Sequence, residues 1–309
     1  MSVPAPQPDR AALAAIADLL SRRAVAVLTG AGMSTESGIP DYRGPDGTRR
    51  VRPMEYAEFV GSAAARQRYW ARAYVGWARF SAARPNAGHR VVAALQRTGH
   101  LGPIVTQNVD GLHQEAGATD VLELHGTLAV VRCLTCEDRS PRDVVQARLA
   151  AANPGFGSTD DDPRALGRIQ PDGDVALADH AVRSFRLVRC RSCGADTLKP
   201  DVVYFGESVP KERVALAYAA VEAGSALLVL GSSLQVMSGY RFVRHAHKRG
   251  TRVAIITRGK TRGDAEATHR LDAGLGESLV ALAAALGVTD DFGAVVDGEY
   301  ATGLPLGLV

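Results

Sequence analysis

The sequence has few cysteines, no long apolar run and almost no net charge. Its 309 residues include four cysteines, too few for the disulfide scaffold of a small secreted domain. No apolar stretch reaches the roughly 18 residues that cross a bilayer, and the opening "MSVPAPQPDR" has no apolar signal core. The net charge of +3 gives no electrostatic reason to expect nucleic acid or a membrane as partner. We therefore expect a cytoplasmic protein that binds neither.

Apolar runs alternate with helical segments along most of the chain. Strands are predicted at 24–28, 102–105, 120–124, 201–205, 225–231 and 252–257, and helices at 10–22, 53–82, 86–98, 211–223, 239–249 and 276–286. Such alternation is typical of a parallel sheet that helices cover on both faces. We predict an α/β protein with a doubly wound, Rossmann-like sheet. From about residue 288 the periodicity is lost, which predicts a loosely packed tail.

Residues 126–199 interrupt this alternation. The segment holds all four cysteines, in two Cys-x-x-Cys pairs: Cys133, Cys136, Cys190 and Cys193. It also holds the Gly/Asp/Pro-rich stretch 153–174, which predicts a loop. Four thiolates suit tetrahedral zinc in a structural site, and a redox Cys-x-x-Cys pair is the alternative. We predict zinc, which would stabilise a small subdomain that has little core of its own.

A glycine-rich turn follows the first predicted strand, in "VLTGAGMSTESGIPDYRG". Gly30 and Gly32 match the dinucleotide fingerprint Gly-x-Gly-x-x-Gly, but Thr35 stands in its third position. Many glycine turns only reverse the chain. A second small-residue turn, at Gly231–Leu234, has backbone N–H groups that can also hold phosphate. Two such turns at one sheet edge favour a dinucleotide more than either turn alone.

Polar segments follow five of the predicted strands, at 30–43, 106–113, 125–126, 231–233 and 257–259. Ligands of doubly wound sheets bind at the carboxyl ends of the strands, so these segments predict one crevice. Gln107, Asn108 and Asp110 bring two amides and a carboxylate together, although an ordinary capped turn has the same composition. His125 ends a predicted strand, but the pattern alone does not choose between His125 and His113.

Six motifs occur in a fixed order along the chain: "GAGMSTESGIPDYRG", "TQNVDGLH", "ELHG", the two cysteine pairs, "LKPDVVYFGE" and "GSSLQV". Together they resemble the sirtuins, which are NAD-dependent protein deacylases, over about residues 10–287. The segments "RQRYWARAYVGWARFS", "PDGDV" and "SSLQVMSGYRF" resemble class II sirtuins, the group that contains the mitochondrial sirtuin four. The resemblance implies a discontinuous Rossmann-like NAD-binding domain (1–45, 86–125 and 200–309), a helical module (46–85) and a zinc-binding insertion (126–199).

The resemblance also implies a site in which NAD is cleaved at its nicotinamide–ribose bond, without hydride transfer. Phosphate contacts are implied for the two small-residue turns and an arginine: Gly30, Ala31, Gly32, Arg43, Gly231, Ser232 and Ser233. Thr35, Asp41 and Tyr42 would belong to a loop over the scissile end of NAD. The nicotinamide ribose and a water would lie at Gln107 and Asn108, and the carboxamide at Asp110. The adenosine would lie against Thr257, Arg258, Gly259 and Leu275.

His125 is the implied general base, with Asn108 and Asp110 as its catalytic companions. The acyl-lysine oxygen would attack the ribose as nicotinamide leaves, giving an alkylimidate. His125 would then help deprotonate a ribose hydroxyl, a task that suits a side chain with a free pKa of about 6.5. Water would release lysine and O-acyl-ADP-ribose. The acyl-lysine protein substrate would add as a strand between "SLQV" and the segment Val203, Tyr204, Phe205 and Gly206.

Three positions depart from the usual sirtuin pattern, and one pair of residues adds to it. Tyr42 stands where Phe is usual, Thr257 where Asn is usual, and Ser238 near a common Pro. The pair Tyr69-x-x-Arg72 is similar to one with which another sirtuin branch recognises acidic acyl groups. A core tyrosine beside a surface arginine is the alternative interpretation of that pair.

We therefore predict an NAD-dependent protein-lysine deacylase that uses NAD and Zn²⁺, with its acyl preference left open. The enzymatic alternatives are a protein mono-ADP-ribosyltransferase and a lipoamidase. The non-enzymatic alternatives are an NAD sensor and a zinc-ribbon binding module. The near-neutral charge argues against a nucleic-acid module, and the joint presence of Asn108, Asp110 and His125 argues against an inactive sensor.

Overall fold

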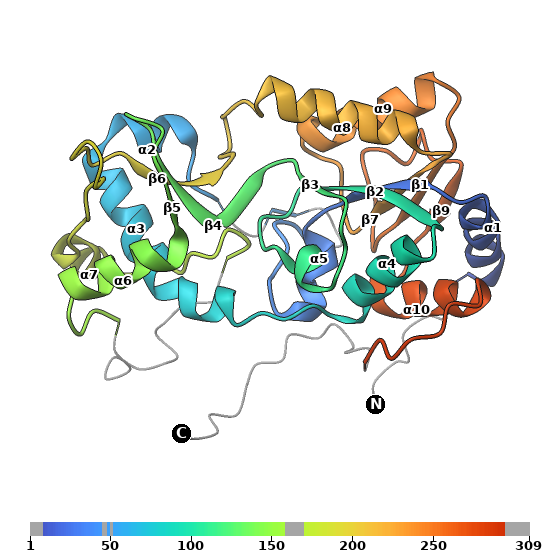
Figure 1. Ribbon diagram of the computed structural model, residues 1–309, viewed down its shortest axis with the longest axis horizontal. Coiled ribbons are helices and arrows are strands. Elements are labelled where there is room, and N and C mark those ends of the chain that lie inside the picture. Colours follow the sequence, from blue (N-terminus) through green and yellow to red (C-terminus); the bar gives the residue numbers. More distant parts are fainter. Residues whose placement is uncertain (1–8, 45–47, 50–51, 158–169, 294–309) are drawn as a thin grey trace.

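The computed structural model describes residues 9–44, 48–49, 52–157 and 170–293. Two lobes lie side by side along the longest axis of the molecule, one around a six-stranded sheet and one around a three-stranded sheet (Figure 1). The middle of the loop predicted at 153–174 and the end of the predicted tail lie outside the described residues.

The larger sheet is entirely parallel. Its strands are β1 (Val25–Thr29), β2 (Leu101–Thr106), β3 (Val121–Glu123), β7 (Leu227–Leu230), β8 (Val253–Ile256) and β9 (His269–Leu271), in the spatial order β3-β2-β1-β7-β8-β9. Counted within this sheet alone, that is the strand order of a doubly wound dinucleotide-binding fold, with its switch point between β1 and β7. The predicted fold class is confirmed.

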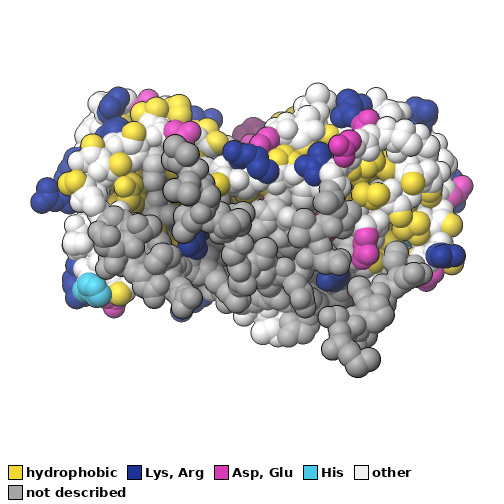
Figure 2. Space-filling view, turned by 90° about the horizontal axis from the view of Figure 1, so that it is seen from below, with side chains coloured by type: hydrophobic (Ala, Val, Ile, Leu, Met, Phe, Trp, Pro, Cys, Tyr) yellow, Lys and Arg dark blue, Asp and Glu magenta, His cyan; other side chains and the backbone are white. Residues whose placement is uncertain are grey.

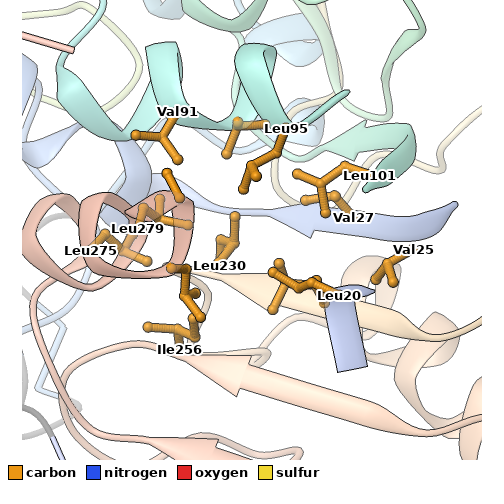
Figure 3. Packing of buried hydrophobic residues seen from close by; sticks show 14 of the residues in the cluster. Leu20, Val25, Val27, Val91, Leu95, Leu101, Leu230, Ile256, Leu275 and Leu279 are labelled. Carbon is orange, nitrogen blue, oxygen red and sulfur yellow. The ribbon is translucent and has the colours of Figure 1, made fainter. Parts of the chain in front are cut away.

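Helices cover both faces of this sheet (Figure 1). One layer contains α1 (Arg10–Ser21), α4 (Ala87–Arg97) and α10 (Leu275–Ala285), and the other contains α8 (Lys211–Ala223) and α9 (Met237–Lys248). Alternate residues of β1 enter different cores: Val25 and Val27 belong to the core that also contains residues of α1, α4 and α10 (Figure 3), whereas Ala26 and Leu28 belong to the core with α8 and α9. Because both faces of the strand are buried, its sequence is an unbroken apolar run.

The second lobe combines the helical segment before α4 with the cysteine-bearing segment. Its elements are α2 (Tyr56–Gly61), α3 (Ala63–Ser81), β4 (Gly126–Cys133), β5 (Arg139–Pro141), α6 (Arg142–Ala152), α7 (Asp179–Ser184) and β6 (Leu198–Val202), and its sheet has the order β5-β4-β6. One hydrophobic core joins α3 to this sheet. Trp70 Nε1 donates to the carbonyl of Leu198 at 2.9 Å, so the aromatic residues of α3 serve packing.

Three expectations need correction. The strand predicted at 201–205 is wrong in place and in sheet: only 201–202 are strand, as the end of β6, and β6 pairs antiparallel with β4 in the smaller sheet. The chain after residue 288 is not loose up to residue 293, since Val288 and Phe292 are buried and Arg90 Nε donates to the carbonyl of Phe292 at 2.6 Å. The three-residue strand β9 was missed because a short sequence such as His-Arg-Leu carries no strand signal.

The visible surface agrees with the small net charge. On the face shown in Figure 2, basic and acidic side chains are scattered among apolar and uncharged ones. In the part of the chain that the structure describes, no helix is long and apolar enough to cross a membrane.

Candidate active site

A cleft of about 1310 Å³ lies at the carboxyl ends of the parallel strands and extends toward the second lobe. The structure brings most of the predicted site residues to its wall: 30–32, 35, 41–43, 107, 108, 110, 125, 203–206, 231–233, 257, 258 and 275. Among the described residues, the wall of the cleft does not include three predicted site residues, Gly259, Tyr69 and Arg72. One cavity therefore joins the switch point of the large sheet to the chain that leaves β6.

The two small-residue turns pack directly on each other. Gly30 N donates to the carbonyl of Leu230 at 3.0 Å, and Gly32 N donates to that of Gly231 at 2.9 Å. A β-carbon on Gly32 would lie 2.9 Å from the Gly231 oxygen, and one on Gly231, whose φ is +61°, would lie 2.5 Å from Met33 N. The contact between the turns therefore requires glycine at these positions, in addition to any close approach of a phosphate to the backbone.

A 3₁₀ helix, η1 (Ala31–Ser37), follows the first turn where a dinucleotide fold usually begins an α-helix. The third glycine of the fingerprint serves close packing of that helix on the strand. Here Thr35 is exposed, and its hydroxyl donates to the carbonyl of Gly32 at 3.0 Å. Gly38, at φ +83°, ends the segment. The missing glycine therefore reflects a different local structure.

Asn108 and Asp110 share one partner, Ser34. The Ser34 hydroxyl donates to Asp110 Oδ2 at 2.7 Å, and Asn108 Nδ2 donates to Ser34 Oγ at 3.0 Å. Burial raises the pKa of Asp110, although hydrogen bonds from Leu112 N and Ser34 oppose the shift. Asp110 Oδ1 accepts from Leu112 N at 3.0 Å and so also caps α5 (Leu112–Glu115). The turn-capping interpretation and the site interpretation of Asp110 are compatible.

Gln107 ties three parts of the cleft together. Its Nε2 donates to the carbonyl of Thr29 at 3.1 Å and to Ser232 Oγ at 2.9 Å. A β-carbon on Gly239, in the first turn of α9, would overlap the Gln107 side chain. The end of β1, the second small-residue turn and the start of α9 are therefore held at fixed positions around one amide.

His125 lines the cleft, whereas His113 lies in the core with 1% of its surface exposed. His125 Nδ1 lies 3.0 Å from the carbonyl oxygen of Gln107, and Nε2 lies 2.9 Å from Ser238 Oγ. Burial lowers the pKa of His125 to about 4, the Gln107 carbonyl raises it in part, and the charge of Arg213 lowers it further. The imidazole is therefore neutral at pH 7.

Tyr42 lies in the loop after η1 and contacts the chain that leaves β6. Its ring meets that of Phe205 edge-on, with centroids 5.6 Å apart. Burial raises the pKa of Tyr42, and the charges of Asp172 and Asp174 raise it further. Asp172 lines the cleft, and burial together with the Asp172 charge raises the pKa of Asp174 to about 8. The hydroxyl of Tyr42 thus stays protonated beside a buried acidic pair.

The wall opposite the parallel sheet is the chain that leaves β6. Val203 N donates to the carbonyl of His125 at 2.7 Å, and Tyr56 N donates to that of Phe205 at 2.9 Å. Tyr204 N donates to Glu207, whose carboxylate also pairs with the buried Lys199 at 2.9 Å. This segment is therefore fixed to the backbone of His125 on one side and to the second lobe on the other.

The four cysteines form a compact cluster. All their sulfur atoms lie within 4.8 Å of one another, with 3.6 Å between Cys133 and Cys193 and 3.7 Å between Cys136 and Cys190. Tetrahedral zinc with bonds of about 2.3 Å separates its sulfur ligands by roughly 3.8 Å, so the cluster fits zinc. These two short contacts join different Cys-x-x-Cys pairs, so all four sulfurs form one cluster, which favours the metal over a redox pair.

The chain matches the Sir2 family over residues 30–238. It belongs to that family, the sirtuins. This sirtuin is 52% identical to NAD-dependent protein deacetylase 1 of Streptomyces coelicolor over 282 residues, which cover 91% of this chain and 92% of that protein. It is 51% identical to the protein of the same name from Mycobacterium avium over 265 residues, or 86% of this chain and 92% of that one.

Solved structures give the same result. A structure of Sir2 with a p53 peptide and NAD⁺ has a TM-score of 0.70 and 27% identity, and the match covers 89% of this sirtuin and 98% of that chain. A structure of Sir2 bound to an acetylated peptide has a TM-score of 0.69 and 25% identity, over 90% and 99% of the two chains.

The predicted acyl-recognition pair is not brought to the cleft of this sirtuin. Tyr69 is 1% exposed and packs against the rings of Phe59 and Tyr204. The charge of Arg72 lowers the pKa of Asp174, which places Arg72 near the acidic pair. The interpretation of Tyr69 as a core residue is therefore the better one, because its buried ring is already packed against other rings and is not presented to a ligand.

Three residues that line the cleft were not predicted as site residues from the sequence. Ser34 was hidden inside the glycine-rich turn, and Asp172 inside a stretch predicted only as loop. Ser238 was noted as a departure from the family pattern, but its contact with His125 joins positions 113 apart in the chain. A repeated Asp in "PDGD" is the one local signal that could have drawn attention to Asp172.

Proposed function

We propose that this sirtuin is an NAD-dependent protein-lysine deacylase that converts acyl-lysine, NAD and water to lysine, nicotinamide and O-acyl-ADP-ribose. The observation that carries this proposal is the position of a neutral His125 in one cleft with Asn108, Asp110 and the segment 203–206. Two relatives about half identical to this chain are named NAD-dependent protein deacetylases, which supports the same reaction.

The cleft fits NAD by the chemistry of its wall. Bound NAD would supply the electrophilic ribose carbon and the leaving nicotinamide. The backbone of Gly30–Gly32, together with Ser233 and Arg43, would hold the phosphates, because N–H groups at small-residue turns bind anions. Asp110, whose pKa burial raises, would accept from the nicotinamide amide. Thr257, Arg258 and Leu275 would contact the adenosine.

His125 would act as general base. The Gln107 carbonyl can only accept, so His125 Nδ1 carries the ring hydrogen and Nε2 presents its lone pair. That lone pair would take the proton of a ribose hydroxyl. A base acts best when its pKa lies near the working pH, and a value of about 4 in the cleft without substrate makes this ring a weak base until the ligands are bound.

The peptide would bind between segment 203–206 and residues 235–237. Val236 and Met237 are exposed apolar residues at the cleft, at 38% and 41% of their surface. An extended peptide there could add main-chain hydrogen bonds to either edge. Because Val203 N already donates to His125 and the Phe205 carbonyl already accepts from Tyr56, the peptide would use other backbone groups of this segment.

The cysteine cluster would hold zinc in a structural role. Four thiolates fill the tetrahedral coordination of zinc and leave no position for a substrate. The cysteines are absent from the described wall of the cleft. Zinc would therefore act on the stability of the second lobe and not on the reaction.

An acyl-lysine peptide panel with NAD tests the proposal. Mass spectrometry should detect deacylated peptide, nicotinamide and O-acyl-ADP-ribose in equal amounts for at least one acyl group. NAD-derived mass on the protein, without O-acyl-ADP-ribose, would replace the proposal by ADP-ribosyl transfer. Absence of nicotinamide release with every peptide would refute both activities. The acyl preference, the class II branch, the cytoplasmic location and the three domain boundaries stay predictions.

A further inference from the structure

The proton-accepting nitrogen of His125 has a partner in the protein itself. Ser238 Oγ lies 2.9 Å from Nε2, and both residues line the cleft. The opposite ring nitrogen, Nδ1, lies 3.0 Å from the Gln107 carbonyl. The imidazole is therefore held at both of its polar atoms.

The direction of each hydrogen bond follows from the atoms involved. A carbonyl oxygen has no hydrogen to give, so Nδ1 must donate to Gln107. In the neutral ring Nε2 then carries only a lone pair, and the Ser238 hydroxyl must donate to it. A hydroxyl can also rotate and accept, so the same contact persists after Nε2 has gained a proton.

The backbone around Ser238 is fixed by the same residue that holds Nδ1. Ser238 lies in the first turn of α9, where Gly239 N and Tyr240 N donate to the carbonyl of Val236 at 3.3 Å and 3.2 Å. Gly239 packs so closely on Gln107 that a β-carbon there would overlap its side chain. The backbone carbonyl of Gln107 thus contacts His125, and its side-chain amide packs on Gly239, the residue next to Ser238.

We propose that Ser238 is a positioning residue for the general base, which donates to Nε2 before proton transfer and accepts from it afterwards. The proposal rests on the proposed function of His125. Nε2 has one lone pair, so the Ser238 hydroxyl turns away from it when the ribose hydroxyl approaches. As the ribose O–H bond breaks, Nε2–H forms, and Ser238 Oγ accepts from it once the ribose oxygen has moved to the imidate carbon. The ring keeps its orientation throughout.

The experiment compares Ser238→Ala and Ser238→Thr with the full-length wild type. Two rates are measured: exchange of labelled nicotinamide into NAD, which precedes the base-dependent step, and formation of O-acyl-ADP-ribose. Ser184→Ala is the control, because the Ser184 hydroxyl donates to the Ala181 carbonyl within α7, at 2.8 Å, outside the site. Loss of a hydrogen bond to the base should lower product formation by Ser238→Ala about tenfold, while exchange and the KM for NAD stay near wild type.

Ser238→Thr keeps a hydroxyl and should retain most of the product rate. The nitrogen NMR signal of His125 Nε2 should move toward that of an unbonded lone pair in Ser238→Ala and stay in place in Ser238→Thr. If Ser238→Ala does not fold, Ser238→Cys replaces it, because a thiol is a weaker donor than a hydroxyl. The same lower product rate and the same shift of the Nε2 signal are then expected. Wild-type product formation together with an unmoved Nε2 signal would overturn the proposal. If the wild type releases no nicotinamide, the proposed function fails, and the NMR comparison alone decides the contact.

Discussion

The two lobes of this sirtuin are held together by different chemistry. The larger lobe surrounds strands of Val, Leu, Ile and Ala that are buried on both faces. The smaller lobe packs aromatic rings around two buried cations: Arg142, 2% exposed, lies over the rings of Trp70 and Trp77, and Lys199 pairs with Glu207. The stabilisation from aliphatic burial does not depend on the direction of contacts, whereas a buried charge needs its partners in place. The smaller lobe should therefore be the more sensitive to single changes and to loss of its metal.

Removal of zinc should give the largest effect and confine it to the smaller lobe. Binding to four thiolates contributes folding free energy directly, so chelation should lower the midpoint of thermal unfolding by about 10 °C or more. Hydrogen exchange should rise in β4, β5 and β6 and stay slow in β1 and β7. The chelator should have no further effect on Cys133→Ser. Equal loss of protection in both sheets would show that the lobes do not differ in this way.

Unlike zinc removal, His125→Ala should abolish activity and leave the fold unchanged. Removal of a general base costs about 10²- to 10⁴-fold in rate, and O-acyl-ADP-ribose formation reports it. The unfolding midpoint should stay near wild type, because His125 belongs to neither core. His247→Ala, an exposed histidine on α9, is the matched control and should remain active. If His125→Ala deacylated its substrate at the wild-type rate, His125 would not be the general base.

Arg142→Ala should destabilise the smaller lobe. The guanidinium lies 4.6 Å and 5.1 Å from the ring centroids of Trp77 and Trp70, and it donates to the Ala73 carbonyl at 3.0 Å. Loss of these contacts and the resulting cavity should cost about 3 kcal/mol in the free energy of unfolding, measured in urea. Arg139→Ala, at an exposed ion pair with Asp201, should cost less than about 1 kcal/mol. If Arg142→Ala and Arg139→Ala lowered the free energy of unfolding equally, burial of Arg142 would not explain its contribution to stability.

Acidification should weaken the larger lobe through His113. Burial lowers the pKa of His113 to about 4, below the value of about 6.5 in an unfolded chain. Between these values the unfolded state binds the proton and the folded state does not, so stability falls as the pH drops. From pH 7 to pH 5 this residue should cost about 2 kcal/mol. Urea unfolding at both pH values measures the loss, and His113→Asn should show a smaller pH dependence. An unchanged dependence would mean that another group is responsible.

The same contrast explains what the sequence could predict. The glycine turns, the polar ends of the parallel strands and the paired cysteines are local patterns, and the structure brings them together as expected. The strand predicted at 201–205 was assigned to the wrong sheet because a short apolar run such as Val202–Phe205 does not indicate which sheet, parallel or antiparallel, it joins. The contacts of Ser34 with Asp110 and of Ser238 with His125 join distant parts of the chain, and no local pattern encodes them.

The interlocked turns of the larger lobe also restrict how this protein can evolve. Gly32 and Gly231 leave no room for a β-carbon on either side of their contact. A side chain gained at one turn would require the other turn to retreat at the same moment, and two matched changes rarely arise together. Each glycine thus restricts which residues can replace the other, even though the whole second lobe lies between them in the sequence.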